Sequence, residues 1–313
     1  MSGEADFLRR LRAMVVDPAA RGLMDDAALL ATSGEQIVLT SDTLVGGVHY
    51  LPGDPADTVG WKLAAVNLSD LAAKGATPRA CMLNYALTGD ANWDAAFLDG
   101  LAHALGQYSM PLIGGDTVAL PTGAPRVLSL TAIGAVPAGK SVPDRGGAKP
   151  GDVLYLSGPV GDAGAGLKIL QAGQAEPAAL VEAYRKPKPD LVLGQSIGSF
   201  ANAMMDVSDG LLIDADRMAR ASGCAMEIDR IPLSAHYAAL HGLSVASRLA
   251  AATAGDDYVL LAALSPEALP PPGLIAIGRC TNGAGISLVL DGTSVTLPQR
   301  LGYEHGPLPG VQP

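Results

Sequence analysis

Residues 67–78 read N-L-S-D-L-A-A-K-G-A-T-P, with a single acidic residue among apolar and small ones. They form the end of a predicted helix that begins near Ala56 and carries apolar residues among alanines, at Leu63, Val66, Leu68 and Leu71. Most of this helix is expected to be buried, yet Asn67 and Asp70 are three residues apart and share a face. A carboxylate on a buried helix is costly unless it is paired or binds a metal ion. Gly75 and Pro78 end the helix, which leaves the question of what Asp70 faces.

The composition limits the classes of protein to which the chain can belong. Its 313 residues suggest one large domain or two ordinary ones. The formal net charge of −10 argues against a nucleic-acid partner, which would need a basic face. A phosphate-bearing substrate stays compatible with this charge, because a divalent metal ion can reverse the local sign.

The sequence also carries no sign of secretion or of a membrane. Cys81, Cys224 and Cys280 are far apart and form no C-x-x-C pair, which argues against a structural zinc site and against a disulfide framework. The first ten residues include acids and lack the apolar segment of a signal peptide. No apolar run is long enough to cross a bilayer. We therefore expect a cytoplasmic protein with no membrane partner.

Strands and helices intermix in both halves of the chain, which predicts an α/β protein of two domains. Residues 137–151 are rich in Pro and Gly and read as a linker. We expect an N-terminal domain over residues 1–137, a linker over 138–150, a C-terminal domain over 151–305 and a disordered tail over 306–313. Further helices are expected over residues 6–16, 93–108, 161–172, 191–204 and 211–222. Strands are expected over 36–40, 79–88, 110–113, 127–136, 153–157, 225–228, 258–263, 274–279 and 286–290.

Acidic residues recur at loops and at the ends of the predicted elements. They are Asp25, Asp26, Asp42, Asp70, Asp116, Asp206 and Asp209, mostly beside Gly, Ser or Thr. If the fold brings them together, so many carboxylates cannot all stay ionised without cations. Oxygen ligands from Asp, Ser and Thr suit Mg²⁺, Mn²⁺ or Ca²⁺ rather than zinc. Each acid taken alone is also explained as a turn former or a helix cap, but the whole set favours a metal site.

A second motif is misleading. Residues 134–141, G-A-V-P-A-G-K-S, match the phosphate-binding P-loop pattern letter for letter. A P-loop must open directly into a helix whose N-terminus holds the phosphates. Here the chain continues as V-P-D-R-G-G-A-K-P-G-D, and its prolines and glycines exclude a helix of useful length. We therefore reject the P-loop interpretation.

Five blocks together resemble a known family. They are S-D-T-L-V-G-G-V-H-Y-L-P (41–52), A-V-N-L-S-D-L-A-A-K-G-A-T-P (65–78), L-I-G-G-D-T (112–117), G-A-K-P-G-D (147–152) and D-V-S-D-G-L (206–211). Their order and spacing resemble the thiamine-monophosphate kinases, from about residue 4 to Tyr303. That family belongs to the ATP-binding superfamily of aminoimidazole ribonucleotide synthetase. The resemblance implies a two-domain fold of mixed-sheet α+β layers, with N-terminal sheets that pair into a barrel across a homodimer.

The resemblance also implies a site in a cleft between the domains, with ATP as co-substrate and several Mg²⁺ ions. The implied metal ligands are Asp26, Thr40, Ser41, Asp42, Asp70, Asp116, Asp206 and Asp209. The implied ATP contacts are Gly115, Asp116, Arg145 and Ser208, and the implied contacts to thiamine monophosphate are His49, Asp256 and Tyr303. Among these, Asp70, Asp116, Arg145 and Asp209 are expected to be catalytic.

The chain departs from the family pattern at two places. Met24-Asp25-Asp26 stands where the family has G-D-D, so the loop loses a glycine but keeps both acids. Residues 254–260 read A-G-D-D-Y-V-L where the family has G-G-E-D-Y-E-L. The carboxylate of Asp256 is therefore one methylene shorter than the expected Glu, which reduces its reach toward a cationic thiamine.

The implied activity is ATP-dependent phosphorylation of thiamine monophosphate to thiamine diphosphate by direct in-line transfer. Two alternatives remain at this point. One is another ATP-using enzyme of the superfamily; selenophosphate synthetase would need a reactive Cys near the N-terminus, and the hydrogenase maturation enzyme needs a C-terminal Cys. The first Cys here is Cys81 and the chain ends G-V-Q-P. The other alternative is a non-enzymatic protein that binds divalent metal ions.

Overall fold

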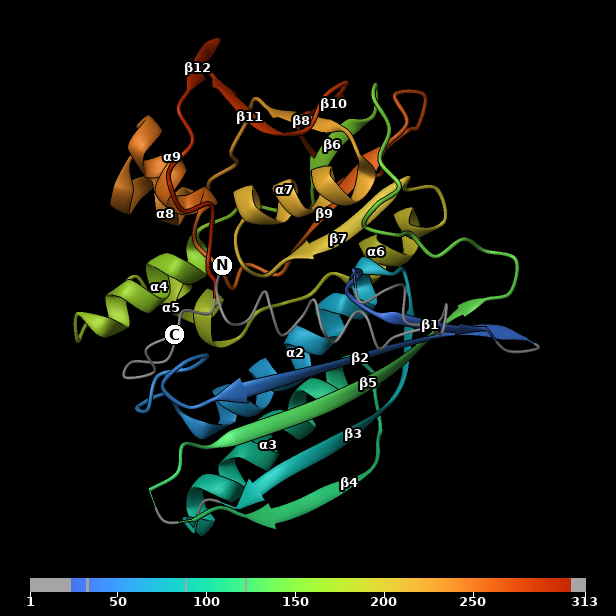
Figure 1. Ribbon diagram of the computed structural model, residues 1–313. Coiled ribbons are helices and arrows are strands. Elements are labelled where there is room, and N and C mark those ends of the chain that lie inside the picture. Colours follow the sequence, from blue (N-terminus) through green and yellow to red (C-terminus); the bar gives the residue numbers. More distant parts are fainter. Residues whose placement is uncertain (1–23, 32–33, 88, 122, 305–313) are drawn as a thin grey trace, which may run out of the picture.

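The computed structural model describes residues 24–31, 34–87, 89–121 and 123–304, and Figure 1 shows their arrangement. The predicted helix over residues 6–16 and the predicted tail over 306–313 lie outside the described residues. Two mixed sheets, one from each half of the chain, lie on either side of a central helix.

That central helix is α2 (Ala56–Ala73), which contains most of the sequence block from which the prediction started. It is buried on nearly every side, because other elements pack around its whole circumference. Glycines allow the closest approaches. A Cβ on Gly60 would lie 2.1 Å from the Phe97 carbonyl oxygen of α3 (Ala91–Gln107), and a Cβ on Gly194 of α6 (Leu191–Gly198) would lie 2.2 Å from the Ala72 carbonyl oxygen. Helix α2 thus joins the two halves of the molecule.

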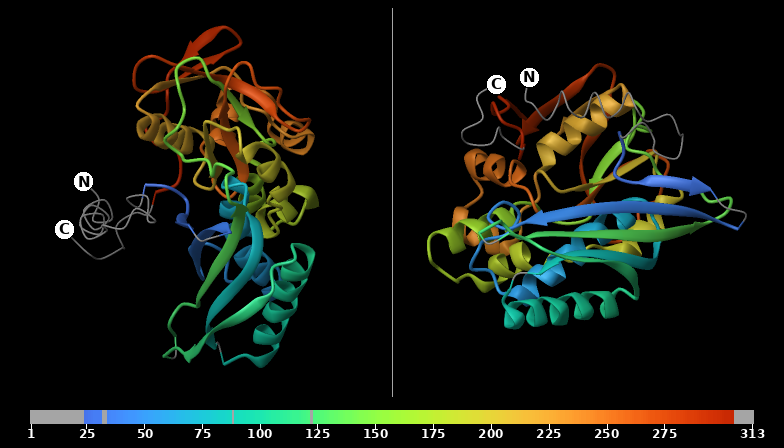
Figure 2. Two further views of the ribbon diagram at one scale, coloured as in Figure 1. Left: turned by 90° about the vertical axis from the view of Figure 1, so that its right-hand side faces the viewer. Right: turned by 60° about the horizontal axis from the view of Figure 1, so that its bottom comes forward.

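The N-terminal sheet has five strands in the order β1-β2-β5-β3-β4. Their bounds are Ala28–Ala31 (β1), Glu35–Val45 (β2), Thr77–Leu87 (β3), Leu112–Ala119 (β4) and Val127–Pro137 (β5). All neighbours are antiparallel except β3 and β4, which are parallel. Helices α2 and α3 lie along one face (Figures 1 and 2). Within the described part of the chain nothing covers the other face, where Ser41, Thr43, Met82 and Asn84 are exposed.

The C-terminal sheet has seven strands in the order β12-β11-β8-β10-β6-β9-β7, of which only β8 and β11 are parallel neighbours. The strands are Val153–Leu156 (β6), Ala203–Val207 (β7), Ala225–Ile228 (β8), Val259–Leu264 (β9), Ile275–Thr281 (β10), Gly285–Leu290 (β11) and Thr293–Val295 (β12). Helix α7 (Leu211–Ser222) packs on one face of this sheet. The remaining helices are α4 (Asp162–Gln171), α5 (Ala178–Arg185), α8 (Ala235–His241) and α9 (Val245–Ala252).

Strand alternation in β7 places one carboxylate toward the centre of the molecule. Ala203, Met205 and Val207 belong to the core that contains α7, whereas Met204 belongs to the core that surrounds α2. Successive side chains of a strand point to opposite faces, so Asp206 shares the face of Met204. Asp206 therefore faces α2.

Several predicted elements differ from the structure. The predicted helix over residues 191–204 is wrong at its end, because α6 stops at Gly198 and Ala203 begins β7. A strand buried on both faces reads as a continuous apolar run, which periodicity cannot distinguish from a buried helix. The predicted strand over 110–113 is too short, because β4 runs from Leu112 through the whole G-G-D-T block.

Residues 134–141 do not open a helix. Gly134 lies within β5, and residues 138–141 are not helical. The rejection of the P-loop is therefore confirmed. No helix among the described residues is long and apolar enough to cross a membrane.

Candidate functional site

A cavity of about 770 Å³ lies beside α2, between the two sheets. Its lining contains eight of the residues that the sequence singled out: Asp42, His49, Asp70, Asp206, Ser208, Asp209, Asp256 and Tyr303. They come from both halves of the chain, and the fold brings them together although up to 261 positions separate them (Asp42 and Tyr303).

Asp70 lies in the last turn of α2 and faces strand β2. Thr40 donates a hydrogen bond from Oγ1 to Asp70 Oδ2. The backbone N–H of Asp42 donates to Asn67 Oδ1 at 3.2 Å, and Asn67 Nδ2 donates in turn to the Leu63 carbonyl oxygen at 2.9 Å. Thr40 and Asp42 are two residues apart on β2 and so share its α2-facing side. The pairing of Asn67 with Asp70 on one helix face, predicted from their spacing, thus places both side chains against β2.

Asp206 reaches the same place from the C-terminal sheet. Ser69, next to Asp70 in the sequence, donates a hydrogen bond from Oγ to Asp206 Oδ2 at 2.6 Å. Asp70 and Asp206 are therefore held on neighbouring positions of α2 and β7, inside the cavity.

Burial and mutual repulsion disfavour the ionised form of these carboxyl groups. Burial raises the pKa of Asp70 well above its usual range, and the charges of Asp42, Asp206 and Asp26 raise it further. Burial likewise raises the pKa of Asp206, with Asp26 as the next cause. The pKa of Asp42 is raised to about 6, by burial and then by Asp26. Four carboxyl groups thus form one electrostatic cluster, which we name the Asp70 cluster: Asp26, Asp42, Asp70 and Asp206.

Cationic side chains balance the Asp26 end of this cluster. Arg145 forms an ion pair with Asp26 Oδ1, and Lys74 Nζ lies 3.2 Å from Asp26 Oδ2 and 2.5 Å from Asp25 Oδ1. Lys74 is fully buried and also donates to the Met204 carbonyl oxygen at 3.2 Å. Lys74 belongs to the same sequence block as Asp70 and was not predicted as a site residue, although a lysine at the end of a buried helix also needs a partner.

The loop after β7 carries Ser208 and Asp209 into the cavity. Arg217 Nη1 lies 2.5 Å from Asp209 Oδ2, and the Asp209 backbone N–H donates to Asp214 Oδ2 at 3.0 Å. The Tyr303 backbone N–H donates to the Asp209 carbonyl oxygen at 2.9 Å, which brings Tyr303 to the same rim. Asp209 is thus held by an arginine and a second carboxylate that the motif did not reveal.

His49 and Asp256 also line the cavity. The Val45 backbone N–H donates to His49 Nδ1 at 3.0 Å, so Nδ1 is an acceptor. The Asp256 backbone N–H donates to the Ser208 carbonyl oxygen at 2.7 Å, which joins the loop over residues 254–257 to the loop after β7. Asp256 has φ +69°, in the left-handed region that Asp tolerates better than most residues.

Three predicted residues lie elsewhere. Ser41 alternates with Thr40 and Asp42 and is exposed on the opposite face of β2, where its Oγ is 3.0 Å from Thr131 Oγ1. Gly115 and Asp116 lie on β4, an edge strand whose residues are all exposed. The register runs Asp42–Leu130–Leu83–Gly115 across the sheet. Three strand spacings put Gly115 about 14 Å from Asp42. Within one chain, Asp116 is therefore remote from the Asp70 cluster.

Comparison with known proteins agrees with this geometry. The family models for the N-terminal and C-terminal domains of AIR synthase related proteins match residues 24–136 and 149–291. The thiamine-monophosphate kinase of Caulobacter vibrioides is 38% identical over 97% of this chain and 91% of its own length. This chain belongs to the thiamine-monophosphate kinase family. It is therefore an enzyme of the kinase class, and the two-domain fold of mixed sheets that the resemblance implied is confirmed.

Solved structures of related proteins have folds similar to that of this kinase. The structure described as AaThiL complexed with AMPPCP and TMP has a TM-score of 0.83 and 29% identity, covering 97% of this chain and 96% of that one. The thiamine-monophosphate kinase from Stenotrophomonas maltophilia K279a has a TM-score of 0.75 and 36% identity, covering 93% and 96%.

The donor set of the kinase suits a hard divalent cation. The atoms at the Asp70 cluster are carboxylate and hydroxyl oxygens, as Mg²⁺ prefers. Asp26 Oδ2 is buried and accepts no hydrogen bond, and its charge is met by the Lys74 ammonium 3.2 Å away. Among the described residues no three acidic, Cys or His side chains already converge as a ready metal cage. The residues present thus fit Mg²⁺ in chemistry, with further oxygens still required.

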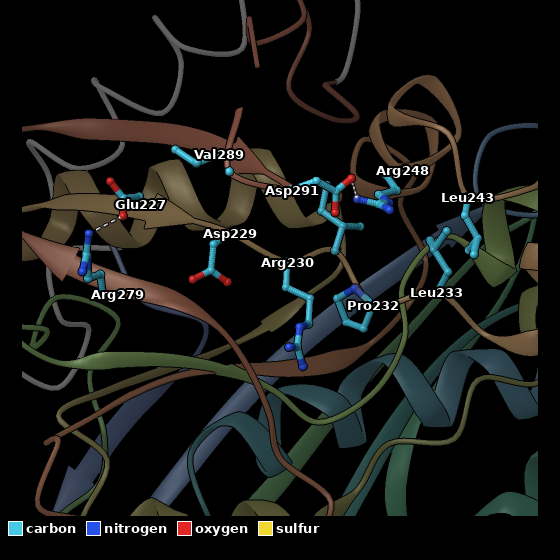
Figure 3. A pocket seen from close by; sticks show the side chains of 12 residues that line it. Glu227, Asp229, Arg230, Pro232, Leu233, Leu243, Arg248, Arg279, Val289 and Asp291 are labelled. Atoms are coloured by element: carbon cyan, nitrogen blue, oxygen red, sulfur yellow. Dashed lines mark hydrogen bonds and ion pairs between the residues drawn. The ribbon is translucent and has the colours of Figure 1, made fainter. Parts of the chain in front are cut away.

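The kinase has a second hollow on its C-terminal half, of about 740 Å³ (Figure 3). None of the predicted site residues line it. Its arginines at 279 and 248 pair with Glu227 at 2.7 Å and with Asp291 at 2.9 Å. Four of its six charged lining residues are thus paired with one another, and the first cavity is the candidate active site.

Proposed function

We propose that this kinase phosphorylates thiamine monophosphate with ATP and yields thiamine diphosphate and ADP. Family membership supports the proposal, as does the similarity to a structure whose title names AMPPCP and TMP as ligands. The observation that carries it is the single cavity lined by three members of the Asp70 cluster, Asp42, Asp70 and Asp206, together with His49, Asp256 and Tyr303.

In this proposal the Asp70 cluster holds Mg²⁺ and Arg145 meets a phosphate of ATP. Asp26, Asp42, Asp70, Asp206 and Asp209 would be the metal ligands, with Thr40 beside them. Mg²⁺, when bound, would neutralise part of the negative charge of the phosphate groups. Arg145 Nε is buried and has no hydrogen-bond partner, so it has a donor left for a phosphate while Nη2 stays on Asp26.

The transfer itself needs no general base from the protein. The second pKa of a phosphate monoester is about 6, so the acceptor oxygen is largely deprotonated at neutral pH. The main obstacle is repulsion between two phosphate groups at close range. We infer a direct in-line transfer in which the chain's task is to hold donor and acceptor phosphates in line, with Ser208 on the ATP side and His49, Asp256 and Tyr303 on the acceptor side.

We infer that Asp116 contributes to the site of a partner chain in a homodimer. The edges of the N-terminal sheet are β1 and β4, and β4 exposes Leu112, Ile113 and Val118. An exposed apolar edge strand normally pairs with something. Pairing of each β4 with the partner's β1 would close two sheets into a barrel. It would also bring Gly115 and Asp116 of one chain toward the partner's Asp26, because Asp26 lies two residues before β1.

A product assay tests the activity. Purified protein is incubated with ATP, Mg²⁺ and thiamine monophosphate, and thiamine diphosphate and ADP are quantified, with each component omitted in turn. We expect equal amounts of both products, and none when any component is omitted. ADP formation without thiamine diphosphate would instead support another ATP-using activity of the superfamily, and binding of Mg²⁺ without ATP consumption would support a non-enzymatic metal-binding protein.

A further inference from the structure

Lys62 is a buried lysine that the motifs did not single out. It lies on α2, eight residues before Asp70 and so on a similar side of the helix. Its side chain is only 3% exposed. Lysine is almost never fully buried unless it is paired, so its partners indicate what it does.

Those partners come from three separate segments, and two of them, the loops of His49 and Asp256, line the cavity. Lys62 Nζ donates to Asp256 Oδ2 at 2.7 Å and to the His49 carbonyl oxygen at 3.1 Å. The same ammonium lies 4.2 Å from the centre of the Tyr184 ring, within cation–π range. One ammonium thus joins the loop of His49, the loop of Asp256 and helix α5.

The Asp256 carboxylate is held at both oxygens. Lys62 occupies Oδ2, and Tyr258 donates its hydroxyl to Oδ1 at 3.0 Å. Lys62 and Asp256 also balance each other's charge, which matters because an isolated buried charge is far more costly than a pair. The short Asp side chain therefore stays against Lys62 and has little freedom to follow a substrate.

His49 is fixed by the same contact from the other side. Its carbonyl oxygen is bound by Lys62, and its ring Nδ1 accepts from the Val45 backbone N–H. With both ends of the residue held, the ring keeps one orientation at the cavity lining.

We propose that Lys62 is a positioning residue of the acceptor site: its ammonium holds the Asp256 carboxylate and the His49 loop in one arrangement, and so sets the affinity for thiamine monophosphate without touching it. This inference rests on the proposed function for the identity of the acceptor. A merely structural role for Lys62 would change stability but would leave the two substrates equally affected.

The test compares Lys62→Met with the matched variant Lys188→Met, which makes the same chemical change at an exposed lysine. For Lys62→Met we expect KM for thiamine monophosphate to rise about tenfold, the factor of a lost charged hydrogen bond, and KM for ATP to stay within about twofold. Lys188→Met should leave both constants unchanged. Lys62→Gln serves as the second variant if Lys62→Met does not fold. A folded Lys62 variant with unchanged KM for thiamine monophosphate, or with both KM values raised alike, would overturn the proposal.

Two further measurements separate this inference from the activity itself. In the double variant Lys62→Met/Asp256→Asn, KM for thiamine monophosphate should be no higher than in the worse single variant. Either change alone already removes the same ion pair between Lys62 and Asp256, so the effects should not add. Hydrogen exchange of the amides at residues 45–52 and 254–258 should be faster in Lys62→Met than in the wild type, even if the wild type phosphorylates a different acceptor. Unchanged exchange in both segments would refute the positioning role, whereas an inactive wild type would refute only the proposed function.

Discussion

At the scale of single residues, the site is dominated by charges that the protein places where they are costly. Asp70 and Asp206 are both buried, which raises the pKa of each, and the charge of Asp206 raises the pKa of Asp70 further. Removal of one charge should therefore stabilise the protein in the absence of metal, since buried charges are retained for function rather than for stability.

Asp70→Asn keeps the shape of the side chain and removes its charge. In metal-free solution we expect the variant to be more stable than the wild type by on the order of 1 kcal/mol, the equivalent of about one pKa unit. Addition of Mg²⁺ should raise the thermal midpoint of the wild type more than that of the variant. Thermal unfolding with a chelator and with Mg²⁺ measures both effects. Equal gains from Mg²⁺ in the two proteins would argue against Asp70 as a ligand.

Asp257 gives a pH-dependent prediction that is independent of the metal site. Burial raises the pKa of Asp257 well above its usual range, although the Gly161 backbone N–H donates to its carboxyl group. The folded state therefore keeps this proton after the unfolded state has lost it, and stability falls as pH rises above about 4. In the Asp257→Asn variant the side chain at this position does not titrate in this pH range. Urea unfolding from pH 4 to pH 8 should show the variant gaining stability relative to the wild type as pH rises, and a constant difference would contradict the assignment.

The convergence of the acidic residues was predictable from the sequence where an acid lies within one of the motif blocks, as at Asp42, Asp70 and Asp206. Three of the cations were not: Lys62 and Arg217 stand outside the motif blocks, and Lys74 lies in one but was not singled out. Their partners, Asp256, Asp25 and Asp209, are 194, 49 and 8 residues away in the chain. Such pairings depend on tertiary packing, which one sequence does not reveal.

At the scale of elements, helix α2 organises the molecule because two other helices approach its backbone closely. The prediction of this helix from residue 56 is confirmed, and helix α7 and strand β8 were predicted with the bounds observed. Helices α5, α8 and α9 were missed because they have only seven or eight residues, too few for a clear helical period.

The contact between α6 and α2 can be tested at Gly194. A Cβ there would meet the Ala72 carbonyl oxygen at 2.2 Å, so Gly194→Ala must push the helices apart. We expect a loss of about 1–3 kcal/mol in the free energy of unfolding. Gly106→Ala on α3 is the matched control: nothing lies within 4 Å of its added Cβ, and alanine should stabilise that helix by about 0.5–1 kcal/mol. Chemical denaturation of both variants measures the difference, and a neutral Gly194→Ala would contradict the packing.

At the scale of the whole molecule, one chain leaves Asp116 on the exposed side of the N-terminal sheet. Asp116 pairs in register with Asn84, which is exposed on the face opposite to α2. Which face of a sheet a residue occupies depends on register and strand order, which a sequence motif does not contain. The resemblance therefore grouped Asp116 with Asp70, although one chain holds them apart. The proposed homodimer resolves this separation by a shared site.

Mixed dimers test the shared site. Asp70→Asn and Asp116→Asn chains, each expected to be inactive alone, are co-expressed so that half of the dimers contain one chain of each kind. One of the two sites in a mixed dimer then carries both native residues, and about a quarter of the wild-type activity should return. As a control, Asp70→Asn with Asp206→Asn should recover nothing, because these two residues act within one chain. No recovery in the first mixture would show that Asp116 does not act on the partner's site.

The central claim is that the Asp70 cluster carries phosphoryl transfer to thiamine monophosphate by holding Mg²⁺. The most direct measurement is the turnover of purified Asp70→Asn at saturating ATP, thiamine monophosphate and Mg²⁺, beside a far-ultraviolet circular dichroism spectrum of the same sample. We predict a native spectrum and a rate at least about 10³-fold below the wild type, the scale of a lost group that stabilises transition-state charge. A folded Asp70→Asn variant that forms thiamine diphosphate at a near-wild-type rate would contradict the account.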